Sequence, residues 1–98
     1  MATAWQRVIA LEGQRLWTVR DRPFRIESVD QATGKIAFYP ESSGKRRTTE
    51  RWRIEMAERL GFVREDVTPT ELREAKVSDL NPAYLTAILR AISTMARP

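Results

Sequence analysis

The chain has 98 residues, of which 42% are hydrophobic and 31% charged, and its net charge at pH 7 is +4. A chain of this length can close one modest core, so we expect a single domain over residues 1–98. The sequence contains no cysteine and no histidine. This absence excludes disulfide frameworks, thiolate or imidazole metal ligands, cysteine nucleophiles and Ser-His-Asp triads.

The excess positive charge lies in the first half of the chain. Residues 1–53 hold 11 Lys or Arg against 6 Asp or Glu, whereas residues 54–98 hold 6 against 7. Of the 17 basic residues 14 are arginine. The excess of arginine has two explanations. The planar guanidinium suits binding of phosphate or carboxylate, and genomic base composition can also favour arginine over lysine. The count alone does not decide between them.

The first predicted element is a short helix over Ala4–Leu11, with Thr3 as its N-cap and Gly13 as its stop. Three runs rich in β-branched and aromatic residues follow, and we expect strands at Arg15–Arg20, Phe24–Val29 and Lys35–Pro40. Turn residues separate these runs, which predicts an antiparallel β-meander. A short fourth strand is expected at Lys45–Thr48.

Alternation along the second and third strands predicts which side chains enter the core. The four core residues expected from the sheet are Phe24, Ile26, Ile36 and Phe38. Arg25 and Glu27 point to the other face.

A helix is predicted after residue 50, with Thr49 as N-cap and Gly61 at its end. Its expected core stripe repeats every four residues, at Trp52, Met56 and Leu60, with Ala57 alongside.

Two helices with strong caps follow. Thr68-Pro69-Thr70-Glu71 is a capping box with proline at the first helical position, and the helix is expected to run through Ala75. Before the last helix, Asn81 is the expected N-cap and Pro82 occupies the first helical position. The apolar stripe of this helix is Leu85, Ile88, Leu89, Ile92 and Met95.

The predicted fold class is therefore α+β. A short N-terminal helix precedes a three- to four-stranded antiparallel meander, and C-terminal helices pack on it. The meander could also curve into an SH3-like or small open barrel. The basic meander covers residues 14–49, and the helical part covers residues 50–96.

The densest polar cluster is a candidate nucleic-acid site. Basic side chains beside aromatic rings are what sequence-tolerant nucleic-acid binding requires, because guanidinium groups engage phosphates and rings stack on bases. The candidate binding residues are Tyr39, Ser43, Lys45, Arg46, Arg47, Arg51 and Arg53. The alternative is a solvated loop in which Trp52 faces the core and Arg51 pairs with Glu55. The arrangement of the arginines in space decides between the nucleic-acid site and the solvated loop. Convergence on one surface favours the binding site, and scatter favours the loop; the residues concerned are Arg20, Arg25, Arg46, Arg47, Arg51 and Arg53.

About a quarter of the chain resembles the hairpin, strand and terminal helix of small archaeal Sul7-type chromatin proteins. The residues concerned are Gly34-Lys35-Ile36, Phe38-Tyr39 and Gly44-Lys45 before a helix. The resemblance implies a sheet face inserted into the DNA minor groove, and it assigns no contact residue. The additional helices depart from that family.

The last helix offers a second kind of binding. We expect Leu85, Ile88, Leu89 and Ile92 either to pack in the core or to form an interface with a second copy or another protein. The same helix is a poor DNA reader, because Arg90 is its one cation ahead of Arg97.

We predict a binding module and not an enzyme, because the neighbouring carboxylate pairs Glu55/Glu58 and Glu71/Glu74 lie beside arginines and resemble charged outer faces. A small-ligand-binding or enzyme fold is the less favoured alternative, and it depends on a pocket that a sequence does not show. No cofactor or metal is expected. No apolar run is long enough to span a bilayer, and the N-terminal residues lack an export-signal pattern. The expected partner is DNA or RNA, and the expected location is the cytoplasm.

Overall fold

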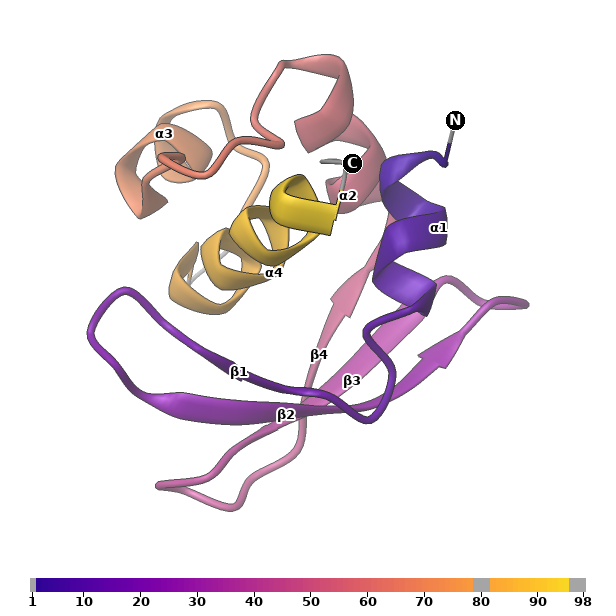
Figure 1. The fold of residues 1–98 in the computed structure, drawn as a ribbon, viewed down its shortest axis with the longest axis vertical. Helices are drawn as coiled ribbons and strands as arrows, with labels where there is room; N and C mark the ends of the chain where they lie inside the picture. The colour runs from indigo at the N-terminus through magenta and orange to yellow at the C-terminus, as the bar shows by residue number, and fades with distance from the viewer. Residues whose placement is uncertain (1, 79–81, 96–98) are drawn as a thin grey trace.

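The computed structural model of the chain describes residues 2–78 and 82–95. Over these residues it contains four helices and one four-stranded antiparallel sheet, which confirms the α+β class (Figure 1). In chain order the elements are α1 (Ala4–Ile9), β1 (Arg15–Trp17), β2 (Pro23–Asp30), β3 (Lys35–Pro40), β4 (Arg47–Glu50), α2 (Arg51–Arg59), α3 (Pro69–Glu74) and α4 (Pro82–Met95).

The sheet is a meander with the strand order β1-β2-β3-β4, so each strand pairs with its neighbour in sequence. It is open, with β1 and β4 as its two edges, and the barrel alternatives do not apply. The bounds of β1 and β4 differ most from those predicted. β1 ends at Trp17 because the chain turns at Thr18, and β4 begins at Arg47, two residues later than expected.

One face of the sheet is covered by helices, and this is where the core lies. Figure 1 shows α1, α2 and α4 on the same side of the sheet. The four predicted core residues, Phe24, Ile26, Ile36 and Phe38, are buried, with exposed fractions of 0–4%. Arg25 and Glu27 lie on the uncovered face, as predicted. A register shift between Ile26 and Ser28 inserts one residue, which returns Val29 to the covered face.

Helix α4 crosses the covered face and contacts α1, α3 and β1. Its residues Leu85, Ile88, Leu89 and Ile92 are 0–3% exposed. Met95, the last residue of the predicted stripe, is 41% exposed and lies outside the core. The predicted cap Asn81 lies outside the described residues. No helix within residues 2–78 and 82–95 has the length and apolar character to cross a membrane.

The stripe predicted for α2 is wrong in part. Ala57 is fully buried and Met56 packs against the core, as predicted. Trp52 is 44% and Leu60 49% exposed, and Ile54, which the predicted stripe leaves out, is fully buried. The reason is the junction with β4: α2 begins at Arg51 without a connecting loop, so the direction of β4 fixes which helix face meets the sheet. Glu50, not Thr49, is the N-cap residue, and its side chain forms no capping bond.

Gly34 makes this junction feasible. The N–H of Arg51 donates to the Gly34 carbonyl at 2.7 Å, which ties the start of α2 to the turn between β2 and β3. Gly34 has a φ of +78°, and a Cβ there would lie 3.0 Å from Cβ of Arg51. Any side chain would therefore meet both backbone strain and a close contact.

The N-caps predicted for the helices at Ala4 and Pro69 are confirmed, in contrast to that of α2. Thr3 caps α1 in a capping box with Gln6, and Thr68 caps α3 in a capping box with Glu71. The N–H of Ala4 donates to Glu58 at 2.8 Å, which ties α1 to α2.

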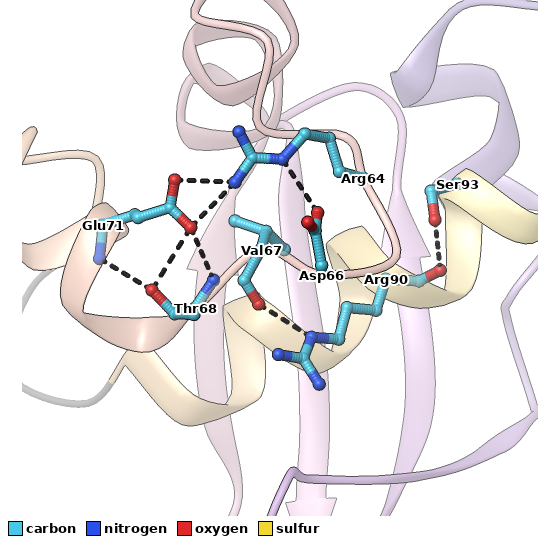
Figure 2. Close-up of polar contacts among 7 residues, drawn as sticks. All are labelled: Arg64, Asp66, Val67, Thr68, Glu71, Arg90 and Ser93. Carbon is cyan, nitrogen blue, oxygen red and sulfur yellow. Dashed lines mark hydrogen bonds and ion pairs between the residues drawn. The ribbon is translucent and has the colours of Figure 1, made fainter.

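A polar network holds the start of α3 against the rest of the molecule (Figure 2). Nη2 of Arg64 donates to both carboxylate oxygens of Glu71, at 2.8 and 2.6 Å, and its Nε donates to Asp66 at 3.1 Å. Nε of Arg90 on α4 donates to the Val67 carbonyl at 2.7 Å. The segment before α3 is thereby fixed to α4.

This network makes a contribution to stability that depends on pH. The hydrogen bonds from Arg64, followed by the Thr68 N–H, lower the pKa of Glu71 below its ordinary value of 4.5. A carboxylate whose pKa is lower in the folded state stabilises the fold above its unfolded pKa, and that stabilisation is lost as the pH falls through the folded pKa. We expect Glu71→Gln to lower the melting temperature at pH 7. The gap to the parent protein should close as the pH falls below about 4.5.

Thermal melts at pH 7 and pH 3 measure this gap. Glu74→Gln on the same exposed helix removes the same charge without the Arg64 bonds and is the control. A gap of equal size at both pH values would contradict the assignment.

Candidate anion-binding site

The predicted basic cluster is not one surface. Arg46 lies in the β3–β4 loop and pairs with Glu27 of the uncovered sheet face, with 2.9 Å between Nε and Oε2. Arg51 pairs with Glu55 at 3.5 Å, and its guanidinium lies 5.2 Å from the centroid of the Trp5 ring. Arg51 belongs to the end of the sheet at Gly34, opposite to the loop that carries Arg46.

Arg53 and Tyr39 are also engaged within the protein. The side chain of Arg53 is 14% exposed, donates to the Val77 carbonyl at 2.9 Å and stacks on Trp52 at 4.4 Å from the ring centroid. Tyr39 is half-buried on the uncovered face, where it is paired with Arg25 across the strands. Ser43 and Lys45 are exposed in the loop between β3 and β4. Arg46, Arg51 and Arg53 therefore point to three different parts of the molecule.

The uncovered sheet face is electrically mixed. Arg15 donates twice to Glu41, at 2.6 and 2.9 Å, and Arg46 is held by Glu27. Arg25 donates to the Gly13 carbonyl at 3.3 Å. This is the face that the Sul7-type resemblance would place in a minor groove, and two of its three arginines are neutralised by carboxylates.

Arg47 differs from the other predicted residues. It is paired with Phe38 across the strands, so its side chain starts from the covered face at the edge of the sheet. Its guanidinium lies 5.8 Å from the centroid of the Tyr84 ring. Tyr84 in turn packs edge-on against Phe24, with ring centroids 5.2 Å apart, and on Phe38 at 5.0 Å. The phenol ring is thus fixed by the core while one side of it meets a cation.

A pocket of about 310 Å³ lies beside Tyr84. Three segments form its walls: the turn between β1 and β2, helix α3, and the start of α4. Figure 1 shows this turn reaching toward α3 and the start of α4. The described lining residues are Thr18, Val19, Arg20, Arg22, Pro69, Arg73, Pro82, Ala83 and Tyr84.

Three of these lining residues are arginines, and no described lining residue is acidic. Within residues 2–78 and 82–95, Arg20, Arg22 and Arg73 form no ion pair. Their charges are therefore not neutralised by a contacting carboxylate of the described chain, although Asp21 stands between the first two in sequence. Like charges that converge on a concave surface raise the local potential and attract anions.

The turn that carries Arg20 and Arg22 is held in one conformation by Thr18, which is 6% exposed. The Thr18 N–H donates to the Arg22 carbonyl at 3.0 Å, and the Thr18 hydroxyl accepts from the Arg22 N–H at 3.2 Å. Asp21 adopts a φ of +59°, a left-handed conformation that aspartate tolerates better than most residues. The two guanidinium groups thus project from an ordered backbone.

Sequence reasoning missed most of this site. The sequence names Arg20 as a residue whose position matters, but it does not indicate Arg22, Arg73 or Tyr84 as site residues. About 50 residues separate Arg22 from Arg73 in the sequence. The available signal was a pair of arginines flanking a turn, which by itself describes any solvated hairpin.

The predicted apolar interface requires a correction. Leu85, Ile88, Leu89 and Ile92 are buried in the core of the chain itself, the other of the two alternatives that the sequence left open. Their periodicity was read correctly, but α1, β1 and the sheet already cover them. This stripe is not a surface of the folded chain.

Comparison of the chain with protein-family models, with curated proteins and with solved structures finds no match to any of them. Over residues 2–78 and 82–95, no three carboxylates gather in a way that could hold a metal ion. The chemistry of the pocket is therefore described by its own side chains, which are cationic donors around an aromatic ring.

Proposed function

We propose that this chain is a non-enzymatic binding module that engages nucleic-acid phosphates at the end of the sheet where the β1–β2 turn meets α3 and α4. Nucleic-acid binding is also the function expected from the sequence, but the proposed site now lies at the β1–β2 turn and α3 and no longer at the β3–β4 loop and the start of α2. The residues that we expect to contact phosphates are Arg20, Arg22, Arg47 and Arg73, with Ser43 and Lys45 on the neighbouring β3–β4 loop.

The observation that carries the proposal is the contrast between two sets of arginines. Arg46 and Arg51 contact carboxylates, whereas Arg20, Arg22 and Arg73 have no ion pair among the described residues and line one pocket. An arginine without an internal partner can engage a phosphate without first breaking a bond. Charge-assisted hydrogen bonds of this kind contribute about 1.5–3 kcal/mol each.

The β3–β4 loop extends the surface. In an antiparallel meander the first and third turns lie at the same end of the sheet, and the pairing of Phe24 with Pro40 brings the ends of β2 and β3 together there. A polynucleotide that crosses the pocket could therefore also contact Lys45. Contacts to phosphates position a nucleic acid and carry no sequence information, so we expect weak sequence preference.

Fluorescence anisotropy with labelled single-stranded DNA, single-stranded RNA and duplex DNA tests the proposal. We expect binding at low salt that weakens steeply between roughly 50 and 200 mM, because bound phosphates release counterions. Arg20→Ala with Arg73→Ala should weaken binding by at least about tenfold and reduce the salt slope.

The matched control is Arg46→Ala with Arg51→Ala, which removes the same charge from ion-paired positions. We expect this control to weaken binding far less than the pocket variant. Failure to bind at low salt would overturn the proposed function, and equal losses in the two variants would overturn the assignment of the site.

A further inference from the structure

We infer that the pocket beside Tyr84 receives a phosphate monoester, the group carried by a phosphorylated chain end or by a free nucleotide. The inference deepens the proposed function and rests on the same arginines. It distinguishes one phosphate chemistry from another: a terminal group that enters a recess, as opposed to a backbone diester that passes over a surface.

The shape of the site favours a terminal group. The pocket is bounded by three separate segments and has a volume of about 310 Å³, near the lower end of the roughly 300–1,000 Å³ of ligand pockets. A monoester carries one substituent and can enter a recess bounded by three segments end-on, whereas a diester phosphate carries a sugar on both sides and needs two ways out. The rest of the chain can then leave through the mouth of the pocket.

The charge of the site fits a monoester as well. Arg20 and Arg22 approach from the β1–β2 turn and Arg73 from α3, and no described lining residue supplies a negative charge. A phosphate monoester carries about −1.5 to −2 charges at pH 7 and has three terminal oxygens as acceptors. A diester carries one charge and two such oxygens. Three guanidinium groups therefore match the monoester better in both charge and hydrogen bonds.

The framework behind the arginines is already ordered, which lowers the entropy lost on binding. Thr18 holds the turn through its two hydrogen bonds with Arg22, and the Thr68–Glu71 capping box holds the first turn of α3 ahead of Arg73. Tyr84 is fixed between the rings of Phe24 and Phe38. Only the arginine side chains themselves must be immobilised by the ligand.

The test compares one short oligonucleotide in three forms, with a 5′-phosphate, with a 3′-phosphate and with hydroxyls at both ends, at about 150 mM salt. We expect one phosphorylated form to bind at least about tenfold more tightly than the hydroxyl form. Arg73→Ala should abolish this preference, whereas Arg46→Ala should keep it. Arg73→Lys keeps the charge but loses the planar fork, so it should retain the salt slope and lose part of the preference.

A nucleoside monophosphate and inorganic phosphate, each added alone, separate the two sources of the group. Backbone amide shifts at Val19, Arg20 and Tyr84 on addition of either would support the pocket as the site. Arg20 and Arg73 are exposed, so folding of the variants can be confirmed by their melting curves.

The outcomes distinguish this inference from the proposed function. Equal, salt-dependent binding of all three oligonucleotides would overturn the inference and leave the proposed function standing. Binding of the mononucleotide without any oligonucleotide would support the pocket and overturn the proposed function. Absence of binding by every probe would overturn both.

Discussion

Ile92→Glu is expected to unfold the protein. The side chain of Ile92 is fully buried in the core cluster, on the face of α4 that carries Leu85, Ile88 and Leu89. A carboxylate at this position would lose its hydration without gaining a partner, a cost of several kcal/mol in addition to the lost apolar burial. A domain of this size has a total stability of about 5–15 kcal/mol. The substitution is therefore expected to remove most or all of the free energy of unfolding.

Circular dichroism and size-exclusion chromatography measure the outcome. Met95→Glu is the control, because it places the same charge on the same helix at a residue that is 41% exposed, and it should leave the fold intact. If Ile92 is a core residue, the Ile92→Glu variant is unfolded. If that variant instead stayed folded and eluted as a smaller species than the parent protein, the stripe would be an interface between copies, and the burial described above would be contradicted.

Ile54→Ala is expected to destabilise the protein far more than Trp52→Ala, although tryptophan is the larger residue. Ile54 is fully buried on the face of α2 that meets the sheet. Truncation of a buried isoleucine costs about 2–5 kcal/mol through lost burial and the cavity left behind. For a domain of this length that corresponds to a fall in melting temperature of roughly 10 °C or more.

Trp52 is 44% exposed and lies outside the core cluster. Its indole N–H donates to Glu50 at 3.1 Å and its ring lies under Arg53 at 4.4 Å. Loss of an exposed cation–π contact costs about 0.5–1 kcal/mol. Thermal unfolding followed by far-ultraviolet circular dichroism avoids the loss of tryptophan signal. A larger fall for Trp52→Ala than for Ile54→Ala would mean that α2 packs in the register predicted from the sequence and not in the one described here.

The elements that were predicted well carry strong local signals. The turn residues between the strand runs specified the meander, and period-two alternation placed Phe24 and Ile26 on the core face. The capping boxes at Thr3 and Thr68 act within a single turn of chain. Such signals depend on residues a few positions apart, so a single sequence contains all of the information.

The face of α2 could not be read in the same way. Trp52, Met56 and Leu60 form one apolar set at helical spacing, and Ile54 with Ala57 forms another. The predicted stripe includes Ala57 but not Ile54. The direct junction of β4 with α2 and the contact of Arg51 with Gly34 select between them. That choice is made by tertiary geometry, and the helix sequence by itself is compatible with either.

The candidate site, too, could be predicted from the sequence only in part. The sequence by itself determined that the chain is basic in its meander half, that it lacks histidine and cysteine, and that Arg47 lies in a dense basic cluster. Only the tertiary structure decided which arginines already have carboxylate partners and which line the pocket beside Tyr84. Ion pairing and convergence depend on distances between side chains from different elements, and those distances exist only after the β1–β2 turn, α3 and α4 have packed together.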